Sequence, residues 1–97
     1  MTVFNYSGSL AASGSTVGER ISQPFNIAIS GTWVGTWALE ALPDGATAWV
    51  NCLQSDGSQN SYSSNGLITV PNVFGDDMLF RLTFTRTSGT LEWRFFR

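Results

Sequence analysis

Apolar and polar residues alternate along most of this chain, which is the pattern of β-strands with one buried face. Every second residue is apolar in the runs 25–29, 33–41, 78–84 and 91–95. Apolar residues at helical spacing are absent and helix breakers recur, so we expect strands to form the whole fold. The expected core-facing residues are Phe25, Ile27, Ile29, Trp33, Trp37, Leu39, Ala41, Met78, Phe80, Leu82, Phe84, Leu91, Trp93 and Phe95.

Short glycine-containing segments between these runs predict turns. Ser30-Gly31-Thr32 and Pro43-Asp44-Gly45 each combine residues that favour a turn with a glycine that accepts positive φ. We expect the chain to reverse at both segments, so that the strand after each one pairs with the strand before it.

The last two alternating runs predict a closing hairpin. Keeping both apolar faces on one side requires an even number of loop residues. A four-residue loop at 87–90 places Thr85 opposite Glu92 and Arg81 opposite Phe96. A two-residue loop would instead place two arginines opposite each other, which is unfavourable.

Seven or eight short strands in 97 residues predict one all-β domain covering residues 1–97. A single flat sheet of this length would leave one aromatic face in water, so we expect two packed antiparallel sheets. The expected architecture is an antiparallel β-sandwich, Ig-like or jelly-roll-like. The Gly/Ser-rich residues 7–15 predict a flexible loop or arm, and residues 54–65 a long polar loop.

Charge and composition narrow the possible partners. Only 12% of the residues are charged, the net charge is −2, and lysine and histidine are absent. Without a basic stripe we expect no nucleic-acid partner. No apolar run of about 18 residues and no basic leader is present, so we expect no membrane span or export signal and synthesis in the host cytoplasm. The single cysteine, Cys52, is expected to pack as a small apolar residue.

The chain contains few of the residue combinations that carry out catalysis. Without histidine, neither a Ser-His-Asp nor a Cys-His arrangement can form, so we expect no enzyme and no catalytic residues. Asp76-Asp77 is expected to serve turn chemistry, because neighbouring strand residues point to opposite faces. A calcium site from Asp44, Asp56 and the Asp76-Asp77 pair lacks the ligand spacing of a known loop, so we expect no metal and no cofactor.

Aromatic and arginine side chains supply two alternative binding surfaces. Aromatic residues beside arginines, with few other charges, are typical of protein interfaces. Alternatively, Trp33 and Tyr62 offer a stacking platform for glycans, whereas Trp37 and Trp93 are expected in the core. The candidate interface consists of Phe4, Tyr6, Arg81, Arg94 and Phe96.

Two segments resemble small structural proteins of tailed bacteriophages. The segment FNIAISGTWVGTWALEALPDGATAWVNC is similar to a recurrent pattern in those proteins, with SGTWVGT, a DG turn and a W-V strand. The end of the chain, MLFRLTFTRTSGTLEWRF, resembles their last two strands around a Thr-Ser-Gly turn. Both segments specify strands and turns, so the resemblance implies a fold and a virion context but no ligand residues.

The resemblance implies a decoration or cement protein on the capsid surface, or a small tail or fibre module. A decoration protein binds the major capsid protein on the outside of the head, stabilises the shell and forms a homo-oligomer, with a trimer as one possibility. The alternative from another class is a carbohydrate-binding adhesin that uses Trp33, Tyr62 and the polar loop. These two functions remain open at the level of sequence.

Overall fold

The structure, a computed structural model, describes residues 3–21, 24–52, 61–70 and 78–97, and within them every regular element is a strand. The strands are β1 (Asn5–Leu10), β2 (Gly14–Ser15), β3 (Glu19–Ile21), β4 (Phe25–Leu42), β5 (Val50–Asn51), β6 (Ser61–Tyr62), β7 (Gly66–Val70) and β8 (Met78–Phe96). All eight belong to one hydrogen-bonded antiparallel sheet. The all-β antiparallel class predicted from the sequence is therefore confirmed.

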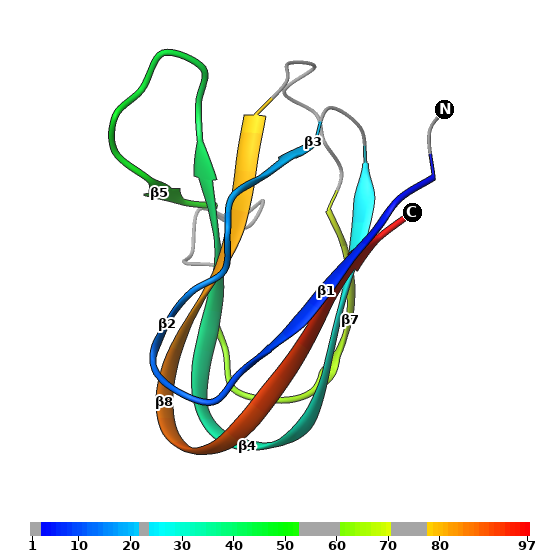
Figure 1. Cartoon of the computed structure of the whole chain (residues 1–97), viewed down its shortest axis with the longest axis vertical. Coiled ribbons are helices and arrows are strands. Elements are labelled where there is room, and N and C mark those ends of the chain that lie inside the picture. The colour runs from blue at the N-terminus through cyan, green and yellow to red at the C-terminus, as the bar shows by residue number, and fades with distance from the viewer. Residues whose placement is uncertain (1–2, 22–23, 53–60, 71–77) are drawn as a thin grey trace.

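Two long strands, β4 and β8, organise the sheet (Figure 1). They pair from Asn26 opposite Phe96 to Leu42 opposite Leu79, and both bend near their middle. The bend divides the sheet into two layers that face each other. The first layer contains β1, residues 89–96 of β8, residues 25–33 of β4, and β7. The second contains β2, β3, residues 78–86 of β8, residues 34–42 of β4, β5 and β6.

Glycines make the bend possible, and here the structure corrects two predicted turns. Gly31, Gly35 and Gly89 have φ values of 93°, 149° and 80°, which residues with a side chain rarely adopt. Residues 30–32 do not reverse the chain, and residues 87–90 do not form a hairpin loop, because both segments lie inside a continuous bent strand. Glycine was expected to allow an unusual backbone conformation here, but that conformation bends a strand instead of reversing the chain.

A β-bulge at Thr87 explains the spacing of apolar residues along β8. Val34 pairs with Ser88, but the next residue of β4, Gly35, pairs with Arg86, so Thr87 has no partner in β4. One extra residue shifts the alternation and keeps both apolar runs of β8 on the inner face. Arg81 consequently pairs with Glu40, and the predicted pairing with Phe96 is wrong.

The hydrophobic core lies between the two layers. Phe25 of the first layer contacts Phe80 of the second, with ring centroids 5.2 Å apart. At the bend, Trp33 meets Phe84 edge to face at 5.6 Å. The buried apolar residues are Ile21, Phe25, Ile27, Ile29, Trp37, Leu39, Ala41, Met78, Phe80, Leu82, Phe84, Leu91 and Phe95, nearly the set expected from alternation.

The N-terminal segment differs from the predicted loop or arm. Ser7–Leu10 continues β1 along β8, and β2 pairs Gly14 and Ser15 with Phe84 and Thr83. Glycine suits this position, because a Cβ at Gly8 would lie only 3.0 Å from the Trp93 indole. The small residues that indicated flexibility thus allow β1 to pack under a tryptophan. The turn at Pro43 is confirmed by a hydrogen bond of 3.0 Å from the Ala46 amide to the Pro43 carbonyl.

Candidate functional site

The outer surface of the first layer is the leading candidate for a binding site. Strand register aligns its outward side chains in three rows that cross β1, β8 and β4, and two of these rows continue onto β7. One row ends at Leu67, which has 64% of its surface exposed. We call this surface the open face; it comprises Asn5, Ser7, Ser9, Asn26, Ala28, Ser30, Leu67, Thr69, Glu92, Arg94 and Phe96.

The open face carries a ridge and low flanks. The long outward side chains Glu92, Arg94 and Phe96 follow one another along β8. Small residues stand on both sides, with Ser7 and Ser9 on β1 and Ala28 and Ser30 on β4. Together these residues line an open trough of about 840 Å³. Its shape and its hydroxyl-rich lining suit a broad, shallow contact.

The two charges on the ridge have no partner within the described residues. Glu92 and Arg94 are exposed, and neither forms an ion pair or side-chain hydrogen bond with any described group. Elsewhere on this layer polar groups are satisfied: Thr69 donates to Asn26 at 2.9 Å, and Arg97 donates to the Pro24 carbonyl at 2.8 Å. The ridge therefore keeps two hydrogen-bonding charges available to another molecule.

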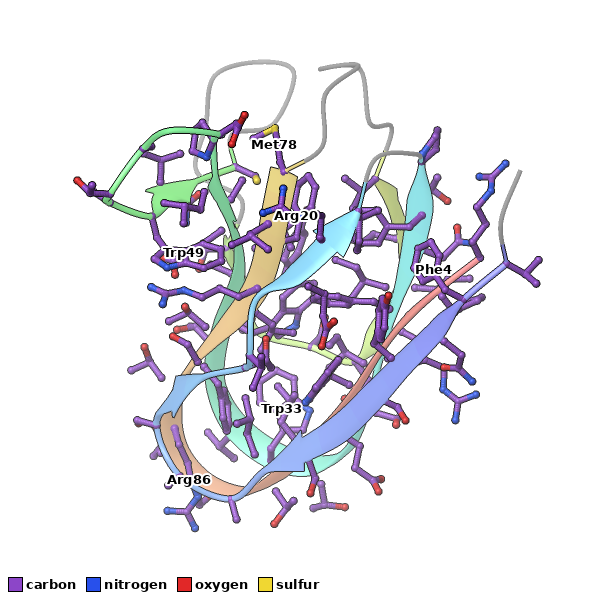
Figure 2. All side chains as sticks on the ribbon, turned by 45° about the horizontal axis from the view of Figure 1, so that its top comes forward. Phe4, Arg20, Trp33, Trp49, Met78 and Arg86 are labelled. Carbon is purple, nitrogen blue, oxygen red and sulfur yellow. The ribbon has the colours of Figure 1, made fainter. Side chains whose placement is uncertain are left out.

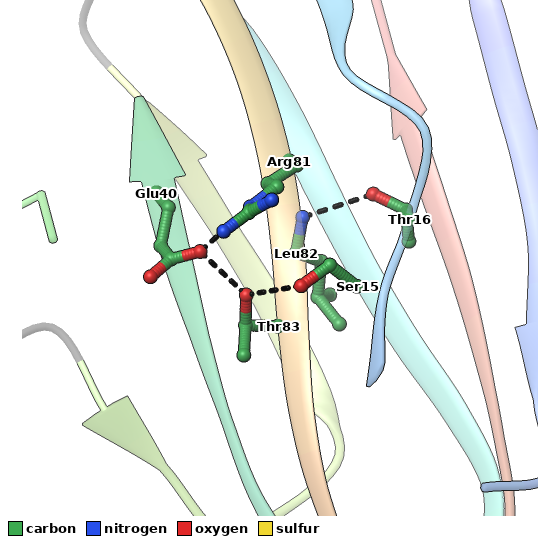
Figure 3. A network of polar contacts seen from close by, with 6 residues as sticks. All are labelled: Ser15, Thr16, Glu40, Arg81, Leu82 and Thr83. Carbon is green, nitrogen blue, oxygen red and sulfur yellow. Dashed lines mark hydrogen bonds and ion pairs between the residues drawn. The ribbon is translucent and has the colours of Figure 1, made fainter. Parts of the chain in front are cut away.

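On the outer surface of the second layer, Glu40 and Arg81 neutralise each other (Figure 3). Arg81 donates to Glu40 at 2.7 Å, and the Thr83 hydroxyl donates to the same carboxylate oxygen at 2.6 Å. Because the only Thr83 hydroxyl proton is used there, Ser15 donates to Thr83 across 2.9 Å. Burial raises the pKa of Glu40, but the hydrogen bonds from Thr83 and Arg81 and the Arg81 charge outweigh it, and the pKa lies below its usual value.

An aromatic side chain also covers part of the second layer. Arg81 lies 4.3 Å from the ring centre of Trp49, a cation–π contact. Trp49 follows the Pro43 turn and also packs on Gly18, where an added Cβ would lie 2.9 Å from the indole (Figure 2). The outer surface of the second layer is thus partly closed by the chain itself, in contrast to the open face.

The structure divides the five predicted interface residues among three places. Arg94 and Phe96 lie together on the open face. Phe4 and Tyr6 are stacked on each other at 5.3 Å and packed against the core, and Phe4 also lines the trough of the open face. Arg81 lies on the second layer and binds Glu40. The five residues therefore do not form one surface.

Both residues of the predicted glycan pair are engaged in contacts within the protein. Trp33 lies inside the bend, where its indole N–H donates to Asn65 Oδ1 at 2.6 Å (Figure 2). Tyr62 packs on Trp37, with ring centroids 4.6 Å apart. Both aromatic faces are used in packing against the core, and Tyr62 belongs to β6 rather than to a loop.

Acidic and cysteine side chains were also considered as metal ligands or nucleophiles. No group of three or more acidic or cysteine side chains approaches closely enough there to hold a metal. Asp56 and the Asp76-Asp77 pair lie outside the described residues. Cys52 is half-buried against the core, and burial followed by the nearby Glu40 charge raises its pKa to about 11. No helix in the described ranges could span a membrane.

Sequence reasoning missed three members of the open face that shape it. Glu92 was expected only as an outward strand position, Ser7 as part of a loop, and no face was assigned to Leu67. Alternation along one strand identifies outward residues, but the strands that lie side by side depend on pairing between distant segments. The rows across β1, β8, β4 and β7 become visible only with the register.

No protein-family model matches the chain, and no curated protein shows significant sequence similarity to it.

Proposed function

We propose that this chain is a non-enzymatic structural protein of a tailed-phage virion, of the capsid decoration type, that binds the outside of the head and stabilises it. The resemblance of its two long segments to small phage structural proteins supports the virion context. Both segments coincide with β4 and β8 and include the bend glycines Gly31, Gly35 and Gly89. The resemblance therefore covers the positions that determine this fold.

The observation that carries the proposal is the contrast between the two outer surfaces. Arg81 of the second layer is paired with Glu40 and stacked on Trp49, whereas Arg94 of the open face is exposed without a partner among the described residues and Leu67 is 64% exposed. Aromatic and arginine side chains are enriched in protein interfaces. We assign the open face as the surface through which the protein assembles in the particle.

Assembly of this kind does not require a strong single contact. Virion shells present many symmetry-related copies of one site, and weak contacts add up when neighbouring copies bind together. A low surface charge also favours contacts that are insensitive to salt. The major capsid protein and further copies of this chain are the partners that the proposal requires.

Cosedimentation with expanded, undecorated phage heads tests the proposal. We expect saturation at a whole-number ratio of bound copies to major capsid subunits. Phe96→Ala should lower the amount bound by at least about tenfold at subsaturating concentration, since an interface aromatic contributes 1–2 kcal/mol or more. The matched control is Val34→Ala, which removes an apolar side chain from the outer surface of the second layer.

Two results would overturn the proposal. The first is absence of head binding by the wild-type protein while it is retained on host polysaccharide, which would establish the adhesin function. The second is equal loss of head binding in Phe96→Ala and Val34→Ala, which would remove the open face from the contact. The packing of Trp33 and Tyr62 against the core gives the adhesin alternative no present support.

A further inference from the structure

The ridge of the open face carries one negative and one positive charge in a self-complementary order. Glu92 and Arg94 are two residues apart on β8, so both side chains point outward from the same face. They lie about 7 Å apart along the strand at the usual rise per residue. Neither pairs with the other or with another described residue.

A second copy of the chain satisfies both charges at once. The copy is placed by a two-fold axis that lies between the two open faces, perpendicular to β8 and at the level of Trp93. The two β8 strands then lie face to face and run in opposite directions. Glu92 of one copy then faces Arg94 of the other, and Arg94 faces Glu92. One rotation forms two equivalent ion pairs, which is the property of an isologous interface.

The relief of the open face concentrates the contact on β8. Because the two-fold axis crosses β8, the ridges formed by Glu92, Arg94 and Phe96 meet each other, and the small residues of β1 and β4 beside them lie farther apart. The two ion pairs on the ridges therefore supply the main contact.

The size of the open face predicts a weak dimer. Four strands spaced about 4.8 Å apart and rows about 7 Å apart give a footprint of about 350 Å². Stable interfaces bury about 800 Å² on each partner, so the contact is expected to form in the micromolar to millimolar range. The high local concentration of copies on a shell would then favour it.

We propose that the open face binds a second copy of this chain, with Glu92 and Arg94 of each copy paired across a two-fold axis. This inference rests on the proposed function in one respect, because it names the partner of the assembly surface assigned there. It replaces the expected trimer by a dimer whose two copies bind the head together, so a variant with a damaged open face still binds the head more weakly.

Charge exchange tests this pairing. Sedimentation equilibrium of the wild-type protein from about 10 µM to 1 mM should give a monomer–dimer equilibrium that weakens with salt. Glu92→Arg and Arg94→Glu each place like charges together and should weaken dimerisation at least about tenfold. The double variant, E92R with R94E, reverses both charges and should return the dissociation constant to within about threefold of the wild type.

The outcomes separate this inference from the proposed function. A wild-type protein that is monomeric at 1 mM, a trimer, or single variants that dimerise as the wild type does would each overturn the pairing. Restoration in the double variant but in neither single variant supports it, since a general structural defect would not be rescued by a second charge reversal. Head binding by a monomeric wild type would reject the dimer and keep the decoration function, whereas a charge-dependent dimer that fails to bind heads would do the reverse.

Discussion

Gly89 of β8 lies directly against Thr32 of β4 at the bend, so close that an added Cβ would overlap the Thr32 carbonyl oxygen and lie 2.7 Å from the Trp33 Cα. Its φ of 80° is also unfavourable for any residue with a side chain. We expect Gly89→Ala to lower the free energy of unfolding by at least about 2 kcal/mol, measured by urea denaturation.

The chain offers a matched control for this substitution. Gly45 has the same φ of 80° but nothing within 4 Å of an added Cβ. Gly45→Ala therefore reports the backbone term alone, about 1 kcal/mol. Equal losses in the two variants would mean that the close approach of β4 and β8 at the bend has no energetic effect.

The bulge at Thr87 predicts the effect of deleting one residue. Without Thr87, Arg86 and Ser88 become neighbours and pair with Gly35 and Val34 in turn, so the alternation runs unbroken and Leu91, Trp93 and Phe95 still face the core. We therefore expect the deletion variant to keep a cooperative urea transition and the near-ultraviolet circular dichroism of the tryptophans. Inserting one alanine after Thr87 instead shifts the alternation by one position, turns these three residues toward solvent and should abolish both signals. A native-like insertion variant, or a deletion variant that does not fold, would contradict the role of the bulge.

The Glu40–Arg81 pair predicts a stability difference that depends on pH. The pKa of Glu40 is lowered in the folded protein, so its carboxylate stabilises the fold above the unfolded-state pKa, and this contribution is lost as pH falls through the folded-state pKa. Glu40→Gln should reduce the free energy of unfolding by about 1 kcal/mol at pH 7. The difference from the wild type should shrink in urea titrations below pH 4.5, the ordinary pKa of this group. A difference that is constant from pH 7 to pH 3 would rule out the ionised pair as its source.

Cys52 should be a slow nucleophile in the folded protein. Burial, and then the negative charge of Glu40, raise its pKa to about 11 from the usual 9.0. The thiolate fraction at pH 8 is therefore about 100-fold lower than for an unperturbed thiol, and alkylation by iodoacetamide should slow at least in that proportion. Protein unfolded in urea is the control. Because the pKa is raised on folding, the thiol also contributes stability that is complete below pH 9.0 and is lost as pH rises toward about 11.

Alternation along the chain was sufficient to predict which residues face the core. Phe80, Leu82 and Phe84 on one side of the bend, and Leu91 and Phe95 on the other, are all fully buried. Alternation reports only the local period, and that period is preserved in a bent strand. The faces of the strands therefore followed from the sequence even where the path of the chain did not.

The path was misjudged at Gly31 and Gly89 for a physical reason. Positive φ allows a chain either to reverse or to bend within a strand, and the pairing partner decides between them. That partner lies far away in sequence: Gly31 pairs with Leu91, and Gly89 pairs with Trp33. At Pro43 the relevant contact is the bond to Ala46, three residues away, and the local prediction was right.

The candidate site was likewise predicted where local alternation was sufficient and missed where long-range pairing decides. Alternation placed Arg94 and Phe96 on one face, and the structure keeps them together. It also placed Phe4 and Tyr6 on one face. Alternation could not show whether that face points to the core or to solvent, because β1 has few apolar residues. Its pairing with β8, Tyr6 opposite Phe95, turns both rings toward the core.

The central pairing of two strands from distant parts of the chain has a kinetic consequence. Asn26 must find Phe96, and Leu42 must find Leu79, before either layer has its middle strands. Closing loops of this length precedes the gain from contacts, so folding should be slow for a domain of this size, on the order of milliseconds to seconds. During synthesis β4 emerges well before β8, and its tryptophans remain unprotected until β8 has left the ribosome.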